Sequence, residues 1–233
     1  MDILTDDFRN YAMKHLGVSG MQFHYWDKMQ ERLYGANASM TPYIVEEREM
    51  RAIQMDIFSR LMMDRIIWIA GPVHDGMSTV VQAQLMWLDL QDSTDITMHI
   101  DTPGGSVKSG LSMIDVMKYI DSDIVTINTG MAASMGSVLL GAGTKGKRYS
   151  LPHSRVMLHQ VSGGSNGNIQ DMRITLLEAE KSNDELFDML GDYCGKTSEQ
   201  VKNDASRDLW FTAKEAKEYG ILDGIITRKG DNP

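Results

Sequence analysis

From about residue 66 onward, short apolar runs alternate along the chain with longer segments that are apolar on one side. Apolar runs of four to seven residues, rich in isoleucine and valine, are typical of buried strands. The predicted strands are 66–70, 96–100, 124–127, 155–159 and 225–226. The segments between them have helical spacing and predict helices at 78–90, 107–119 and 137–143. This alternation predicts an α/β domain with crossover connections.

A longer helix is predicted over residues 169–193, where apolar positions are spread among acidic ones. An isolated helix of this length gains too little from intrinsic propensity and needs packing partners. It either projects from the domain or lies against it. The glycine-rich segment 163–167 comes directly before it.

The first 39 residues are polar, favour a helix around residues 8–16 and end in the small-residue loop 35–39. Such a loop is the best candidate for a domain boundary or a cleavage point. We therefore predict an N-terminal extension or propeptide over 1–39, one domain over 40–228, and a short tail over 229–233.

Composition and charge exclude several classes of function. A hydrophobic content of 42% with 24% charged residues is typical of a globular enzyme. The net charge of −9 argues against nucleic-acid binding. The single cysteine, Cys194, fits a reducing compartment, and no apolar run is long enough to span a membrane. Since a secretory signal is not evident either, we expect a cytoplasmic protein without membrane association. The histidine spacing predicts no metal site.

The residues 130–137, GMAASMGS, are the first candidate for chemistry. Ser134 stands among small residues between two apolar runs, which predicts a strand, a tight turn and a helix. Such a junction exposes a hydroxyl beside free backbone N–H groups, as an acyl-transfer nucleophile requires. Ala132 occupies the first glycine position of the G-x-S-x-G pattern, and a small-residue turn of this kind is also a common structural device.

A serine nucleophile needs an imidazole to accept its proton and a carboxylate to orient that imidazole. His159 lies at the end of a predicted strand, and Asp208 precedes the apolar residues 209–211. Each also has a purely structural interpretation, since a strand-end histidine is often only hydrogen-bonded. Likewise, the Pro-Gly-Gly turn at 103–105 by itself fits an ordinary turn.

Taken together, several motifs resemble the ClpP-type proteolytic subunits of the Clp protease family, peptidase family S14, over residues 42–226. The motifs are IDTPGGSV (100–107), GMAASMGS (130–137), GKR (146–148), MLHQ (157–160), RD (207–208) and EAKEYGILD (215–223). The resemblance implies Ser134 as nucleophile, His159 as general base and Asp208 as the orienting acid. It also implies an oxyanion hole formed by the backbone N–H groups of Gly105 and Met135.

The same resemblance implies a ClpP/crotonase-like superhelix of strand-helix repeats, with residues 169–193 as a projecting handle helix and 163–167 as an adjoining, substrate-lining strand. It implies a homo-oligomer of two stacked heptameric rings, a tetradecamer. Unfolded protein or peptide substrates would be threaded in by a Clp/Hsp100 AAA+ ATPase. The resemblance also implies that this chain needs no cofactor, because the partner would use the ATP. Residues 1–39 are then either a removed propeptide or a permanent axial extension.

Four departures from the family pattern stand out. Asp101-Thr102 replaces the usual Asn-Ser, and Val161 replaces the usual proline after His-Gln. Thr97 and His99 stand at the partner-docking cleft where aromatic residues are usual, and Ser206 replaces an acidic residue. Alternate residues of one strand share a face, so Thr97 and His99 are expected to point the same way.

Two alternatives remain open at the level of sequence. One is a catalytically weak or inactive structural paralogue in a mixed ring, although ring building does not require all of Ser134, His159 and Asp208. The other is an enoyl-CoA hydratase or isomerase on a related fold, which needs no serine-histidine pair.

Overall fold

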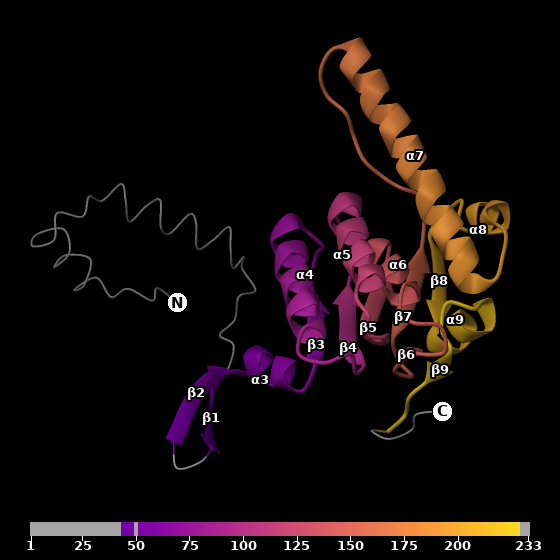
Figure 1. Ribbon diagram of the computed structural model, residues 1–233. Helices are drawn as coiled ribbons and strands as arrows, with labels where there is room; N and C mark the ends of the chain where they lie inside the picture. The colour runs from indigo at the N-terminus through magenta and orange to yellow at the C-terminus, as the bar shows by residue number, and fades with distance from the viewer. Residues whose placement is uncertain (1–42, 49–50, 229–233) are drawn as a thin grey trace, which may run out of the picture. The chain divides into compact units, whose positions relative to one another are not determined.

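The computed structural model describes residues 43–48 and 51–228, with side chains described from residue 55 (Figure 1). The chain divides into two units, Met1–Ile57 and Phe58–Pro233. In the first unit, β1 (Tyr43–Arg48) and β2 (Arg51–Asp56) form an antiparallel hairpin. The predicted extension 1–39, its helix, its cleavage loop and the tail 229–233 lie outside the described residues.

The second unit is built on a seven-stranded sheet. Its main path runs through five parallel strands, β3 (Ile66–Ala70), β4 (Ile96–Thr102), β5 (Ile124–Ala133), β6 (Arg148–Ser150) and β9 (Gly224–Ile225). β5 is long enough to have two partners on one side. Its middle part pairs with β6, and its last three residues pair with β7 (Arg155–Leu158). β7 in turn pairs antiparallel with β8 (Leu209–Thr212). This branch at the end of β5 positions the functional site.

Helices connect and cover the strands (Figure 1). They are α3 (Ile57–Met63), α4 (Asp75–Asp89), α5 (Val107–Tyr119), α6 (Met135–Gly141), α7 (Ile169–Cys194), α8 (Ser198–Asp204) and α9 (Ala213–Tyr219). Their ends follow ordinary capping chemistry. Asn168 accepts a hydrogen bond from the Asp171 N–H at the start of α7, and Gly195 ends that helix with φ 66°. The predicted α/β fold class with crossover helices is confirmed.

The helix α7 combines a buried end and an exposed end. Leu186, Phe187 and Leu190 are buried in the core of the second unit. Toward the N-terminus of the helix, Ile169 is 80% exposed and Ile174 is 66% exposed. Figure 1 shows this end of α7 extending beyond the other helices of the unit. Of the two interpretations of this helix, projection rather than full packing is therefore correct.

Several elements differ from the sequence prediction. β5 continues six residues beyond the predicted end at residue 127, because Met131, Ala132 and Ala133 pair with β7 despite their low strand propensity. β6, β8, α8 and α9 were not predicted. The glycine-rich segment 163–167, expected as a strand, is not one in the structure. It is mostly exposed, and its backbone forms no hydrogen bond with the rest of the described chain.

No helix within the described residues is long and apolar enough to cross a membrane. Those residues also contain no cluster of three or more histidine, cysteine, aspartate or glutamate side chains able to hold a metal ion.

Candidate active site

Ser134 occupies the sharp turn between β5, which ends at Ala133, and α6, which begins at Met135. Its φ of 54° is unusual for a residue with a side chain and stores strain of about 1–3 kcal/mol. Backbone hydrogen bonds hold it on both sides. Its N–H donates to the Met157 carbonyl at 2.9 Å, and its carbonyl accepts from the Ser137 N–H at 3.0 Å. The hydroxyl does not cap α6 and is free for another partner.

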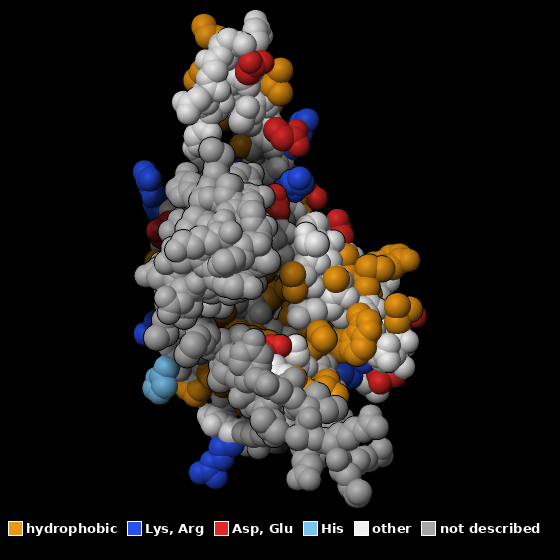
Figure 2. Space-filling view, turned by 90° about the vertical axis from the view of Figure 1, so that its left-hand side faces the viewer, with side chains coloured by type: hydrophobic (Ala, Val, Ile, Leu, Met, Phe, Trp, Pro, Cys, Tyr) orange, Lys and Arg blue, Asp and Glu red, His pale blue; other side chains and the backbone are white. Residues whose placement is uncertain are grey.

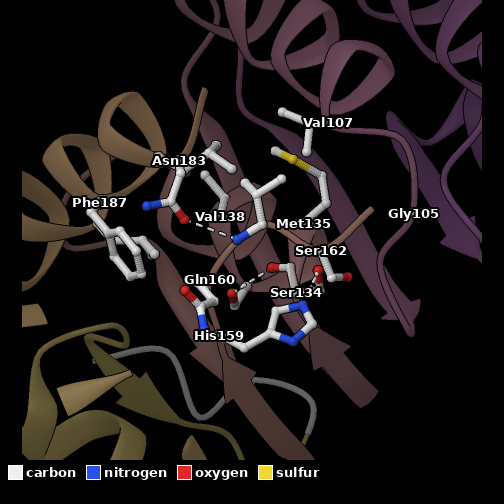
Figure 3. A pocket seen from close by; sticks show the side chains of 14 residues that line it. Gly105, Val107, Ser134, Met135, Val138, His159, Gln160, Ser162, Asn183 and Phe187 are labelled. Atoms are coloured by element: carbon white, nitrogen blue, oxygen red, sulfur yellow. Dashed lines mark hydrogen bonds between the residues drawn. The ribbon is translucent and has the colours of Figure 1, made fainter. Parts of the chain in front are cut away.

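That partner is His159, the first residue after β7. Its Nε2 lies 2.8 Å from the Ser134 Oγ (Figure 3). The sheet explains the contact, since the end of β5 and β7 are paired, with Ala133 opposite Met157. A residue two positions beyond Met157 therefore emerges beside the turn that follows Ala133.

Asp208 reaches the other side of the imidazole through the second strand pair. β7 and β8 are antiparallel, with Leu158 opposite Leu209, so His159 and Asp208 are the next opposing residues. The Asp208 Oδ1 lies 3.3 Å from the His159 Nδ1. Two residues 49 positions apart thus meet because of strand register.

The Ser134–His159 and His159–Asp208 contacts differ in length and in exposure to solvent. The His159 side chain is 23% exposed and the Asp208 side chain 64% exposed, so the carboxylate is largely open to solvent. A Ser134 hydroxyl that donates to Nε2 requires the tautomer in which Nδ1 carries the proton and donates to Asp208. The serine-histidine contact is therefore short and sheltered, and the histidine-aspartate contact is longer and exposed.

A glycine turn packs directly against Ser134. Gly104 has φ 92°, and a Cβ placed there would lie 2.6 Å from the Ser134 Cβ and 2.7 Å from the Ala133 carbonyl oxygen. Val73 fixes the turn, because its N–H donates to the Gly104 carbonyl and its carbonyl accepts from the Ser106 N–H. Only glycine permits this approach.

The backbone N–H groups of Gly105 and Met135 donate to no other residue in the described part of the chain. Both residues line the pocket beside Ser134, together with His159. Two unused N–H donors near a nucleophile are what an oxyanion hole requires. The rest of the lining is mostly apolar and comes from α5, α6, α7 and the segment after β7, with residues Val107, Val138, Val161, Leu186, Phe187 and Leu190.

Comparison with known proteins identifies the family. The family model described as Clp protease matches residues 47–229. The chain is 48% identical over 225 residues to the ATP-dependent Clp protease proteolytic subunit of Bacteroides fragilis strain YCH46, covering 96% of this chain and 100% of that protein. It is 45% identical over 224 residues to the subunit of the same name from Porphyromonas gingivalis strain W83, covering 96% and 98%. The chain belongs to the Clp protease family.

Membership confirms the resemblance found in the motifs and the expected ClpP fold. It makes the chain a protease subunit and a hydrolase of the serine endopeptidase type. The interpretation of the chain as an inactive paralogue is not favoured. Nothing supports the interpretation of the chain as a CoA-binding enzyme.

Thr97 and His99 lie away from the pocket of this Clp protease subunit. Both are partly exposed on β4, between fully buried neighbours, so they share one face as expected. The His99 ring stacks on Trp68 of β3, with 4.6 Å between ring centroids and an angle of 16° between planes. Burial lowers the pKa of His99, and its Nδ1 is buried with no hydrogen-bond partner within the described chain.

Three residues support the site in ways that the sequence analysis did not assign. Thr102 accepts a hydrogen bond from the Gly104 N–H through its Oγ1, and Asp101 accepts one from the Met131 N–H through its Oδ1. Asp101 therefore holds β5 three residues before Ser134. Asn183, on α7, accepts a hydrogen bond from the Val161 N–H. The first two belong to a motif that was recognised, but nothing in the sequence around Asn183 indicates a role.

Proposed function

We propose that this Clp protease subunit hydrolyses peptide bonds with Ser134 as nucleophile, His159 as general base and Asp208 as the group that orients the imidazole. The observation that carries the proposal is the 2.8 Å contact between the Ser134 Oγ and the His159 Nε2, with Asp208 on the opposite ring nitrogen. A serine hydroxyl is a weak nucleophile until such a base accepts its proton.

The chemistry follows from this arrangement. As the Ser134 Oγ attacks the carbonyl carbon, His159 Nε2 accepts the hydroxyl proton and the carbonyl oxygen becomes negatively charged. The N–H groups of Gly105 and Met135 are proposed to stabilise this oxyanion, each by about 3–4 kcal/mol. His159 then gives the proton to the leaving amine as the C–N bond breaks. A water molecule, deprotonated by His159, hydrolyses the acyl-enzyme and restores Ser134.

We further propose that the chain works in a homo-oligomer of two stacked heptameric rings. Exposed apolar side chains support this idea, because contiguous apolar patches on a surface mark sites of protein contact. On the projecting part of α7 they are Ile169, Met172, Ile174, Leu176 and Leu177, and on α4 they are Val80, Met86 and Trp87. Figure 2 shows hydrophobic side chains gathered on one face of the molecule.

A Clp/Hsp100 AAA+ ATPase is the proposed partner that threads unfolded protein or peptide substrates into the rings, in the cytoplasm. The names of the relatives describe their protease as ATP-dependent. The partner would use the ATP, and this chain would need no cofactor. The proposed docking cleft includes Thr97 and His99, next to Trp68, which is 41% exposed.

A fluorophosphonate that reacts with activated serines tests the proposal directly. We expect one adduct, located on Ser134 by peptide mass spectrometry, and hydrolysis of short fluorogenic peptides without ATP. Ser134→Ala should abolish both without changing the size of the assembly. His159→Ala should nearly do the same, because members of such a unit act together.

Ser162→Ala is the matched control, because Ser162 lines the same pocket and its hydroxyl has no hydrogen bond in the described chain. It should keep both the adduct and the hydrolysis. An assembled wild-type protein without an adduct on Ser134 would contradict the proposal and restore the inactive-paralogue interpretation.

A further inference from the structure

The segment that follows β7 carries His159 and then passes along the pocket with few hydrogen bonds to hold it, although the Val161 side chain packs against the core. β7 ends at Leu158, and the backbone of residues 160–166 forms no hydrogen bond with the backbone of any other described residue. The Gln160 side chain reaches the Ser206 carbonyl only at 3.5 Å. A segment of this kind is locally weak, since its backbone polar groups are mostly open to solvent.

One well-formed hydrogen bond anchors this segment. The Val161 N–H donates to the Oδ1 of Asn183 at 2.9 Å, in a partly buried position (Figure 3). The donor lies two residues after His159, and the acceptor lies 22 residues further along the chain, on α7. Both residues line the pocket that contains Ser134 and His159.

Asn183 is well placed to be a fixed point. It lies three and four residues before Leu186 and Phe187, so it shares their face of the helix. Those two side chains are 8% and 2% exposed and fasten this part of α7 to the core. Toward the N-terminus from Asn183, α7 is mostly exposed. Asn183 therefore lies where the projecting helix joins the body of the unit, on its anchored side.

His159 needs such an anchor, because its other restraint is weak. The Asp208 carboxylate is 64% exposed and 3.3 Å from the imidazole. A solvent-exposed pair of this kind contributes little to holding a side chain in place. The direction of the imidazole toward Ser134 must then depend mainly on where the backbone at residues 159–161 lies.

We propose that Asn183 is a positioning residue of the active site. Its carboxamide oxygen holds the Val161 N–H and thereby keeps His159 within hydrogen-bonding distance of Ser134. The inference rests on the proposed function of Ser134 and His159. It also gives Val161 a role. The motif that this chain resembles usually has a proline at this position, and a proline has no N–H to donate. Asn183 and Val161 thus work as a pair.

Two substitutions at Asn183 test this pair. Asn183→Leu keeps the approximate size and removes the acceptor, while Asn183→Asp keeps an acceptor oxygen. We expect Asn183→Leu to lower kcat and the rate of Ser134 labelling by fluorophosphonate about three- to tenfold, the effect typical of one lost hydrogen bond. KM should change less than twofold. Asn183→Asp should restore most of both rates.

A double-mutant cycle separates this role from general damage to α7. Val161→Pro removes the donor, so Asn183→Leu should have no further effect in the Val161→Pro background. Glu185→Leu is the control, because Glu185 is an exposed residue of the same helix whose side chain forms no hydrogen bond or ion pair within the described chain. All rates are compared on assemblies isolated by gel filtration. If Asn183→Leu does not assemble, the smaller truncation Asn183→Ala takes its place.

Labelling of Asn183→Leu at the wild-type rate would overturn the inference. So would an Asn183→Asp variant as slow as Asn183→Leu, or an equal loss from Asn183→Leu with and without Val161→Pro. A failure of the proposed function is distinct from all of these, since the wild-type protein itself would then carry no adduct on Ser134.

Discussion

Gly104→Ala separates the effect of crowding at Ser134 from that of ordinary backbone strain. A Cβ at residue 104 would lie 2.6 Å from the Ser134 Cβ, 2.7 Å from the Ala133 carbonyl oxygen and 3.0 Å from the Met135 nitrogen. Ordinary contacts begin near 3.4 Å, so the turn and Ser134 must separate by about 0.8 Å, the difference between 3.4 and 2.6. A misplacement near 1 Å at a reacting centre costs about 100-fold in rate. We therefore expect kcat/KM for a short peptide to fall by one to two orders of magnitude, roughly tenfold to 100-fold.

Gly146→Ala is the matched control for this prediction. Gly146 has φ 89°, close to the 92° of Gly104, but a Cβ there would meet nothing within 4 Å. Both variants carry the left-handed backbone penalty of about 1–2 kcal/mol. Gly104→Ala adds the cost of the clash, about 1–3 kcal/mol, so its Tm should fall further than that of Gly146→Ala. Only Gly104→Ala should lose hydrolysis and fluorophosphonate labelling. The reasoning is refuted if Gly104→Ala retains half of the wild-type kcat/KM, or if Gly146→Ala loses as much.

Two further predictions concern groups outside the site. Burial would by itself raise the pKa of Asp223, but hydrogen bonds and charge from buried Arg148 lower it below its ordinary value. This contribution to stability is present above the unfolded pKa, near 3.8, and is lost as pH falls through the lower folded value. Asp223→Asn leaves Arg148 buried without its charge partner and should lower the unfolding free energy by about 3–5 kcal/mol. Denaturant titrations at several pH values should also show a weaker dependence of stability on acid. An unchanged unfolding midpoint would contradict this prediction. Burial raises the pKa of the Cys194 thiol to about 11, so at neutral pH only about one part in 10⁴ is thiolate. Cys194→Ala should keep full peptidase activity, and iodoacetamide should modify the native protein far more slowly than the unfolded one. Rapid modification of the native protein with loss of activity would contradict this prediction.

The parts of the fold that were predicted correctly are those in which local pattern and tertiary environment agree. The strand Ile66–Ala70 and the helix Val107–Tyr119 have the same bounds in the structure as in the sequence prediction. The end of β5 was missed, because its residues Met131, Ala132 and Ala133 form a strand only through pairing with β7. Local propensity contains no information about that partner.

The residues of the candidate site also differ in whether their roles can be predicted from local sequence. Ser134 and its small neighbours are recognisable because the turn itself demands them, and His159 and Asp208 because their motifs are short and contiguous. The register that makes His159 and Asp208 opposing residues of β7 and β8 is not visible in either motif. The role of Asn183 could not be predicted from the sequence at all. Its role depends on a single hydrogen bond across 22 residues, from an asparagine on a mostly polar helix.

The geometry also explains why the two halves of the site depend on different things. Ser134 and the glycine turn form one block, in which Gly104 packs directly against Ser134 and the Ala133 carbonyl with no other side chain between them. Hydrogen bonds from Val73 and to Met157 fix this block within the sheet, so the proposed oxyanion donors are preorganised. The imidazole has no such frame, because His159 lies just beyond the last paired residue of β7 and its carboxylate partner is exposed. Its position is then set by α7 through Asn183. Changes that move this helix should therefore alter general-base catalysis before they alter oxyanion stabilisation.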